Sequence, residues 1–273
     1  MGGLYDQLAA DYHLLFPARD EQLSLLTELA GAPPARVLDA ASGSGEYVAA
    51  LSARGYDAYG LELDAVMHAQ AERRHPRLAK KADPHLIRGD MVQADKLLRG
   101  PFRLAACIGN SLAHLSSEAE VASTIEALWG LTRPDGTVIL QLGNFERALK
   151  GGRRAPTPGE QRVSGRRPRP GFVYDLPDLT ATRPDGTELR LERQYLMRRM
   201  GDVSDVSHAP DKLIFRTCLS VGEERREAYT PLLILTWERL RYCLPRAADR
   251  AWYGGFDKSE WSEDAPATIV VLR

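Results

Sequence analysis

The chain has 273 residues, with 36 lysines and arginines against 37 aspartates and glutamates, and a formal net charge of −1. Hydrophobic residues make up 44% and charged residues 27% of it, values typical of a globular protein, which exclude a collagen, a coiled coil and a wholly disordered chain. A net charge so close to zero gives no general attraction to nucleic acid or to an anionic membrane, so neither is expected as a partner.

Cysteine content and hydropathy favour a cytoplasmic location. Cys107, Cys218 and Cys243 are odd in number and widely spaced, unlike the paired cysteines of a secreted disulfide framework. Residues 1–11 include two aspartates and no apolar run of signal-peptide length. The most apolar stretch, residues 232–235, is far shorter than the ~20 residues that span a membrane.

Two helices are predicted at the N-terminus. Apolar residues recur every three or four positions over residues 4–15, and the same spacing returns over residues 23–29 after a break at Pro17. Gly31 and the prolines that follow it end the second helix.

Strands then alternate with helices, a pattern typical of a parallel sheet with right-handed crossovers. Helices are expected at 46–54, 64–75 and 116–131, with Asp64 and Ser116 as the N-caps of the last two. Thr236 is expected to cap a helix that ends near Arg246. The strands are expected at 35–41, 57–63, 85–91, 103–110, 137–142, 250–256 and 267–272. They predict an α/β fold with a seven-stranded, mostly parallel, Rossmann-like sheet.

This alternation is interrupted between residues 150 and 235. Residues 151–171 hold six arginines, four prolines and five glycines, a composition typical of a loop. Strands are predicted at 172–174, 188–197 and 212–221, with hairpin turns at 184–186 and 222–224, as a small antiparallel addition to the main sheet. We therefore expect an N-terminal helical lid (1–34), a core (35–149 and 236–273) and a β-rich insertion (150–235).

The segment V-L-D-A-A-S-G-S-G, residues 37–45, has the pattern of a ligand cradle. A strand that ends in Asp39 is followed by Gly43 and Gly45, which let the backbone approach a ligand, and by a helix N-terminus with free N–H groups. The third glycine of a dinucleotide fingerprint would fall at Val48 and is missing. The pattern therefore favours a ligand without a pyrophosphate.

Acidic residues also end the next two predicted strands. A carboxylate at Glu62 can accept both hydroxyl protons of a ribose, and Asp90 is placed to receive an adenine amino group while Met91 packs on the ring. Open α/β sheets bind their ligands at the carboxyl ends of their strands. These positions therefore predict one nucleoside-binding edge.

With these motifs on one chain, the sequence resembles the class I S-adenosylmethionine (SAM)-dependent methyltransferases, closest to the small-molecule branch of glycine and sarcosine N-methyltransferases. The resemblance rests on residues 37–45, on C-I-G-N-S-L-A-H-L (107–115), on G-N-F-E-R-A-L (143–149) and on W-Y-G-G-F-D (252–257). It implies that SAM is the cofactor and that residues 5–16 form a lid. The residues it implies around the cofactor are Asp39, Ala40, Ser42, Gly43, Gly45, Glu62, Leu63, Asp90, Met91, Ile108, Gly109, Asn110 and Ser111. No metal-ligand spacing occurs in the sequence, and no metal is expected.

The resemblance also implies that Asn144 faces a small-molecule methyl acceptor, because the related enzymes have an asparagine there in an N-Y-D stretch. Arg19 is an approximate counterpart of the arginine that holds a substrate carboxylate in the glycine enzymes. Further candidates for the substrate pocket are Tyr5, Tyr12, His13 and Tyr229. The expected reaction is in-line transfer of a methyl group to an amine, whose lone pair Asn144, His114 or a tyrosine hydroxyl would orient.

Each candidate also has a purely structural interpretation, and other functions stay open. Asn110 and Ser111 could cap the turn that follows them, and Tyr12 and His13 could pack the first helix. An O-methyltransferase would need a base, for which His114 is the candidate. G-N-S-L-A (109–113) misses the hydrolase motif G-x-S-x-G by one residue, with Ser111 as its nucleophile. A non-catalytic cofactor-binding scaffold and a homo-oligomer are compatible with the sequence as well.

Overall fold

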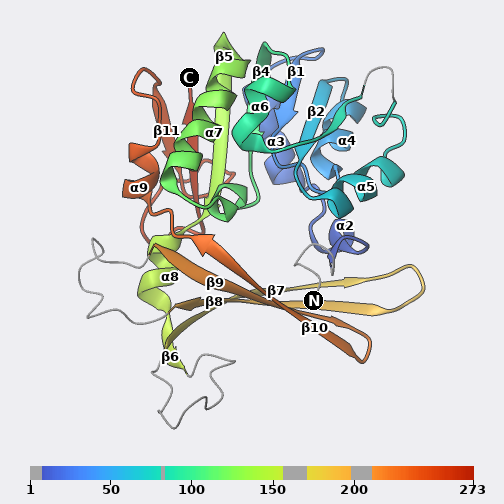
Figure 1. Ribbon diagram of the computed structural model, residues 1–273, viewed down its shortest axis with the longest axis vertical. Coiled ribbons are helices and arrows are strands. Elements are labelled where there is room, and N and C mark those ends of the chain that lie inside the picture. The colour runs from blue at the N-terminus through green and yellow to red at the C-terminus, as the bar shows by residue number, and fades with distance from the viewer. Residues whose placement is uncertain (1–7, 81–83, 156–170, 198–210) are drawn as a thin grey trace.

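The computed structural model describes residues 8–80, 84–155, 171–197 and 211–273, which form two separate sheets. The larger sheet has seven strands in the order β11-β12-β5-β4-β1-β2-β3, and the smaller has five in the order β10-β9-β8-β7-β6. Figure 1 shows the smaller sheet lying across one end of the larger one, with the short helix α2 (Tyr12–Leu15) between them.

The seven-stranded sheet is mostly parallel, as predicted. Its strands β1 (Arg36–Asp39), β2 (Asp57–Glu62), β3 (Leu86–Arg88), β4 (Phe102–Cys107) and β5 (Thr132–Gly143) all run parallel. Strand β12 (Ala267–Leu272) is antiparallel to both of its neighbours, β5 and β11 (Arg250–Tyr253). Crossover helices between the parallel strands place every one of their carboxyl ends at the same edge.

Helices cover both faces of this sheet, so that successive residues of a strand are buried on opposite sides. On one side, α3 (Asp20–Ala30), α4 (Glu46–Ala53) and α5 (Ala65–Arg74) pack over a set that includes Val37, Ala58, Leu104 and Ile139. On the other, α6 (Ala94–Leu97), α7 (Glu118–Leu131) and α9 (Trp237–Tyr242) cover a set that includes Leu38, Leu61, Ala105 and Leu140. This double cover explains the nearly continuous apolar runs of the strands. Within the described residues, no helix combines the length and the apolar character needed to cross a membrane.

The insertion is an independent antiparallel sheet, so the expected addition to the main sheet is corrected. It consists of β6 (Arg153–Ala155), β7 (Gly171–Thr182), β8 (Glu188–Met197), β9 (Lys212–Val221) and β10 (Glu224–Leu233). These strands pair with one another in sequence order. Strands β8 and β9 have the predicted bounds, whereas β7 is longer than predicted. Strand β10, which follows the turn at 222–224, was not predicted as a separate strand.

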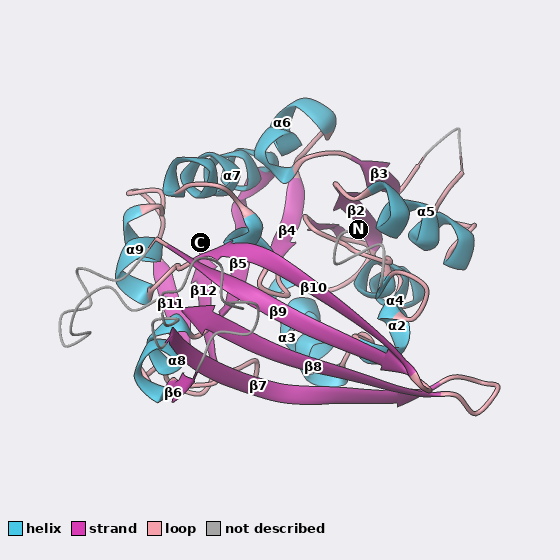
Figure 2. Ribbon diagram, turned by 60° about the horizontal axis from the view of Figure 1, so that its bottom comes forward, coloured by secondary structure: helices cyan, strands magenta, loops and turns pink. Residues whose placement is uncertain are grey.

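The N-terminal segment packs on one face of the five-stranded sheet. Leu8 and Leu15 are buried with Leu189, Leu191 and Leu219 of the sheet. The short helix α2 (Tyr12–Leu15) lies beside the turn end of the sheet and close to α4 (Figures 1 and 2). Most of the Arg- and Pro-rich segment 151–171 lies outside the described residues, as does Tyr5.

Short helices complete the carboxyl edge of the main sheet: η1 (Met91–Gln93), η2 (Ser111–His114) and α8 (Phe145–Gly151). The caps predicted at Asp64 and Thr236 are confirmed, since their side chains accept N–H groups of α5 and α9. The cap of α7 is Ser117 instead of the predicted Ser116. The hydroxyl of Ser116 donates to the carboxylate of Glu120. Strand β5 already begins at Thr132 and therefore includes the predicted turn at 134–136.

Candidate functional site

The loop between β1 and α4 contains the two glycines that are predicted to let its backbone approach a ligand closely. Gly43 has φ 55° and Gly45 has φ 82°, in the left-handed region that favours glycine. A Cβ on Gly43 would lie 3.3 Å from the Met67 methyl group and 3.4 Å from the ring of Tyr12. The loop is therefore a narrow cradle, closed on one side by α5 and on another by the N-terminal segment.

Glu62 at the end of β2 is hydrogen-bonded to this cradle. Its Oε2 accepts the backbone N–H of Gly43 at 2.8 Å, and its Oε1 accepts the N–H of Asp64 at 2.8 Å. Burial raises the pKa of Glu62, and these two hydrogen bonds partly oppose that rise. Each carboxylate oxygen has a further lone pair, so Glu62 can still accept hydroxyl protons from a ligand.

Asp39 at the end of β1 is a buried acid with an unsatisfied oxygen. Only 5% of the residue is exposed, and its Oδ1 has no hydrogen-bond partner among the described residues. Burial raises the pKa of Asp39 to about 7, and the nearby carboxylate of Glu62 adds to the rise. A buried acceptor of this kind fits a positively charged ligand group, which would supply both a hydrogen-bond donor and a compensating charge.

Asp90 and Met91 extend the same edge beyond β3. Asp90 Oδ1 accepts the N–H of Val92 at 2.9 Å and so caps η1, which leaves its second oxygen for a ligand. Met91 Sδ lies 3.9 Å from the thiol of Cys107 at the end of β4. Leu63, which follows Glu62, is 62% exposed and gives this edge an apolar surface suited to a base. Ala40 and Ser42 belong to the cradle loop itself and are buried.

Hydrogen bonds between side chains and main chain join the segment after β4 to the end of β5. Asn110 has φ 68°, and its Oδ1 accepts the N–H of Gly143 at 3.0 Å. Gly109 donates its N–H to Gln141 Oε1 at 2.7 Å. Ser111 donates its hydroxyl to the carbonyl of Ile108 at 2.9 Å, within its own turn. This hydrogen bond serves the turn and gives the hydrolase interpretation no support.

Tyr12 and His13 of the N-terminal segment both lie at the site. The Tyr12 ring faces Gly43, and burial, with the charges of Glu62 and Asp39, raises the pKa of its hydroxyl well above the usual range. Burial also lowers the pKa of His13, and the positive charge of Arg74 contributes. Both side chains are therefore neutral near pH 7.

Two residues of the insertion that the sequence did not single out face this edge. Tyr195 of β8 is buried, its hydroxyl hydrogen-bonds with Asn110, and burial raises its pKa to about 12. Its ring stacks on Phe145 with 5.7 Å between centroids. Burial lowers the pKa of Arg193, two residues earlier on the same face, and the charge of Arg19 lowers it further. Tyr195 thus reaches the carboxyl edge of the main sheet from the second sheet, and Arg193 lies on the same strand face, in electrostatic range of Arg19.

Two predicted substrate contacts have other roles. Asn144 is 5% exposed, and its Nδ2 donates to the carbonyls of Ser262 and Ala265, each at 2.9 Å, while its Oδ1 caps α8. Its polar atoms are therefore committed to the protein. Tyr229 is 47% exposed and pairs in register with Arg216, on the sheet face opposite Tyr195. The structure does not bring Tyr229 to the site.

His114 in η2 is half-buried, and burial lowers its pKa. It is therefore neutral near pH 7, in the state that can accept a proton. No group of three or more His, Cys, Asp or Glu side chains within the described residues is arranged to hold a metal ion.

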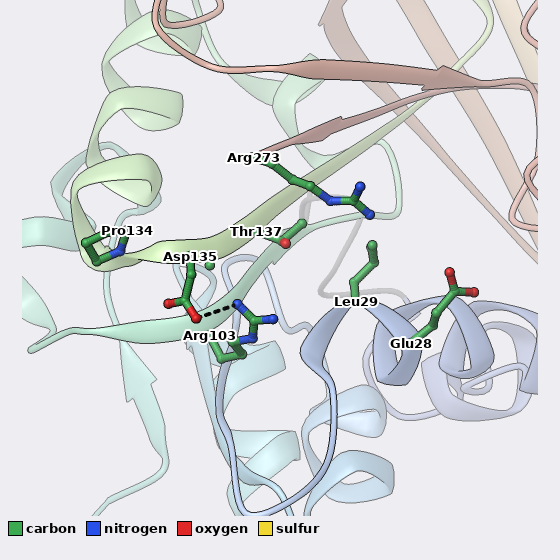
Figure 3. A pocket seen from close by; sticks show the side chains of 8 residues that line it. Glu28, Leu29, Arg103, Pro134, Asp135, Thr137 and Arg273 are labelled. Carbon is green, nitrogen blue, oxygen red and sulfur yellow. Dashed lines mark ion pairs between the residues drawn. The ribbon is translucent and has the colours of Figure 1, made fainter.

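A separate hollow lies at the opposite edge of the main sheet. Figure 3 shows Arg103, Thr137 and Arg273 around it, with the Arg103 guanidinium 3.3 Å from the carboxylate of Asp135. Arg103 and Thr137 belong to the amino-terminal parts of β4 and β5. This hollow is therefore remote from Asp39 and Glu62 and takes no part in the site.

Comparison with known proteins matches residues 37–136, in the first half of the chain, to a protein family. Residues 37–136 match the family model of the methyltransferase domain. The chain is 29% identical over 117 residues to a glycine/sarcosine N-methyltransferase of Aphanothece halophytica, a match that covers 43% of each chain. It is 32% identical over 131 residues to dTDP-3-amino-3,6-dideoxy-alpha-D-glucopyranose N,N-dimethyltransferase of Streptomyces fradiae, over 48% of this chain and 47% of that one. The matched segment is thus less than half the length of either relative.

A solved structure shows the same fold over the whole chain. The crystal structure of a SAM-dependent methyltransferase from Clostridium acetobutylicum ATCC 824 superposes with a TM-score of 0.68 over 98% of both chains, at 12% identity. The predicted fold class is confirmed by this likeness and by the strand order. The resemblance drawn from the sequence is confirmed to this extent: residues 37–136 match the methyltransferase domain, and the chain has the fold of a SAM-dependent methyltransferase.

Proposed function

We propose that the chain is an enzyme that transfers the methyl group of SAM to an amine of a small molecule that also carries an anionic group. The observation that carries the proposal is the placement of a glycine cradle and two buried acids opposite Tyr195 and Arg193. The cradle and the two acids would bind the cofactor, and Tyr195 and Arg193 would bind the methyl acceptor.

The described residues fit SAM. Bound SAM supplies an electrophilic methyl group on a sulfonium. Glu62 accepts the ribose hydroxyls, the unsatisfied Asp39 Oδ1 accepts a positively charged group, and the exposed Leu63 covers one face of the adenine. The cradle needs no phosphate, in accordance with its missing third glycine.

Positioning and exclusion of water are the main tasks of the remaining residues. Tyr195 closes the space above Asn110 and Gly143 with a neutral hydroxyl and a ring, so it can accept a hydrogen bond from the acceptor amine. His114 is neutral, so it can take up a proton from the acceptor. The methylated amine can equally lose its proton to water, so the reaction does not depend on a strong base.

Arg193 and Arg19 support an anionic group on the acceptor. Arg193 donates Nε and Nη2 to the uncharged carbonyl of Pro177 at 3.2 and 2.7 Å, and the negative charge of Asp178 has only a small effect on its pKa. Because Arg19 is close enough to lower the pKa of Arg193 further, this region attracts negative charge. An amino acid carboxylate and the diphosphate of an amino-sugar nucleotide both suit it.

The two relatives favour an amine as the acceptor, since both carry N-methyltransferase activity in their names.

We further propose the division into an N-terminal lid (1–34), a core (35–149 and 236–273) and an insertion (150–235). A cytoplasmic location agrees with three cysteines that are all free and buried.

A thermal-shift panel followed by turnover assays tests this function. SAM and S-adenosylhomocysteine should each raise the melting temperature, because a ligand at 100 times its Kd stabilises the folded state by ~2.7 kcal/mol. Amines with a carboxylate or phosphate should be methylated faster than matched amines without one. Arg193→Gln should remove that preference, whereas Arg190→Gln, on the opposite sheet face, should keep it. Equal methylation rates for amines with and without an anionic group would contradict the proposed class of acceptor.

A further inference from the structure

Three consecutive residues of the N-terminal segment contact three different parts of the protein. Asp11 pairs with Arg183 in the β7–β8 turn, 172 residues away in sequence. Tyr12 lies against Gly43 of the cradle. His13 lies close enough to Arg74, at the end of α5, for the two charges to interact. The segment thus joins the end of the insertion to the cofactor loop (Figures 1 and 2).

The contact between Asp11 and Arg183 has the geometry of a strong ion pair. Arg183 donates Nε to Asp11 Oδ1 at 2.7 Å and Nη2 to Asp11 Oδ2 at 2.6 Å. Asp11 is only 6% exposed, and the pair raises the pKa of Arg183. A two-pronged, charge-assisted pair fixes direction as well as distance, and a buried carboxylate that loses its partner is strongly disfavoured.

The pair fixes the residue next to it. Tyr12 follows Asp11 directly, stacks on Phe16 with 4.6 Å between ring centroids, and reaches the cradle beside Asp39 and Glu62. The apolar contacts of Leu8 and Leu15 with the sheet hold the segment on the sheet surface. The ion pair adds a directional contact beside Tyr12, which lies over Gly43.

We propose that Arg183 is a positioning residue for methyl transfer, which acts through Asp11 to hold Tyr12 over the cofactor loop and so retain bound SAM. This inference rests on the proposed function. It also makes the hairpin end of the insertion part of the cofactor site. Release of Arg183 therefore frees residues 8–16 and lets SAM dissociate faster.

The test compares Arg183→Met, Asp11→Asn and the exchanged pair Asp11→Arg with Arg183→Asp. Arg190→Met is the matched control, because Arg190 on β8 also donates two hydrogen bonds to an aspartate, Asp178, but faces away from the lid. SAM dissociation is measured by stopped-flow fluorescence, and backbone hydrogen exchange is followed over residues 8–16 without ligand. Circular dichroism confirms that each variant is folded.

Each single variant should speed SAM dissociation about tenfold, within the usual range of coupling between two sites, and should raise hydrogen exchange over residues 8–16. The exchanged pair should recover part of both effects, and the Arg190 control should match the wild type. A folded Arg183→Met with wild-type dissociation and protection would overturn this inference alone. A wild-type chain that does not bind SAM would overturn the proposed function and, with it, the positioning role.

Discussion

Glu62 Oε2 accepts the backbone N–H of Gly43 at 2.8 Å and thereby joins the end of β2 to the loop after β1. The carboxylate that we assign to the ribose therefore also shapes the glycine cradle. A ligand that bonds to Glu62 consequently meets a loop whose position is already fixed, which lowers the ordering cost of binding.

Removal of this carboxylate should weaken cofactor binding. Glu62→Ala loses a charge-assisted acceptor and should reduce the affinity for SAM by ~1.5–3 kcal/mol, measured by isothermal calorimetry. Glu72→Ala, which removes an acid on α5 whose side chain is half-exposed, is the control and should bind like the wild type. An unchanged dissociation constant for Glu62→Ala would count against the cofactor site.

The raised pKa of Asp39, about 7, makes SAM binding depend on pH. A bound cation favours the ionised carboxylate, so affinity should rise as the pH increases through about 7, and binding below that pH should release a proton. Calorimetry in buffers of different ionisation enthalpy measures that proton. Asp39→Asn should lose this pH dependence, and a pH-independent wild-type affinity would contradict the assignment.

The same pKa has a consequence for stability. Because the folded-state pKa of Asp39 lies above the unfolded value of 3.8, the folded state binds more protons between these two values. The Asp39 contribution to the free energy of unfolding therefore falls as the pH rises from about 4 to about 7. Denaturant unfolding of the wild type and of Asp39→Asn at both pH values should show the difference.

Asn144 should be a stability residue. Asn144→Ala removes the cap of α8 and the side-chain donor to the buried carbonyl of Ala265, which should lower the free energy of unfolding by about 2–3 kcal/mol. Asn144→Asp keeps the capping oxygen but loses the donors, so it should also destabilise. A variant of full stability and impaired acceptor binding would restore the role at the substrate that the sequence predicted.

The conformation of Gly45 should matter more than that of a glycine in an open turn. Gly45→Ala puts a side chain at φ 82° with its Cβ 3.0 Å from the His75 ring, whereas Gly186→Ala faces a similar φ of 87° with no atom within 4 Å. The left-handed conformation alone costs ~1–2 kcal/mol. Urea unfolding should therefore show a larger loss for Gly45→Ala, and equal losses would mean that the neighbouring ring gives way freely.

Tyr195 should serve the acceptor rather than the cofactor. Tyr195→Phe keeps the ring on Phe145 but removes the hydroxyl that hydrogen-bonds with Asn110. Loss of one such group should reduce kcat/KM for the acceptor about tenfold, equivalent to ~1.4 kcal/mol, with little change in SAM affinity. Tyr229→Phe, on the other sheet face, is the matched control. Equal kinetics for the two variants would remove Tyr195 from the acceptor side.

The sequence predicted that Asp39, Gly43 and Glu62 lie close together, as they do in the structure, because the signals that place them are local. Asp39, Gly43 and Gly45 lie within seven residues, and the strand–turn–helix pattern places them without tertiary information. Glu62 follows from the next strand of the same alternation. Ser116 was predicted as a cap in place of Ser117 because both serines can accept a helical N–H, and only the packing of α7 selects one.

The residues of the proposed acceptor side could not be predicted because their position depends on how the two sheets face each other. Strand alternation puts Arg193 and Tyr195 on one face and Tyr229 on the other, but no local pattern states which face meets the core. The ion pair of Asp11 with Arg183 spans 172 residues and has no sequence signature. Asn144 was assigned by resemblance, whereas its hydrogen bonds come from a loop more than a hundred residues later.

The most direct test of the account is the transfer of a labelled methyl group. SAM carrying a carbon-13 methyl group is incubated with the protein and an anionic amine, such as an amino acid or an amino-sugar nucleotide, and the product is followed by NMR. We predict a new labelled N-methyl signal on the acceptor, strongly reduced in Glu62→Ala at limiting SAM. Tight binding of SAM without label transfer to any such amine would contradict the proposed methyltransferase function.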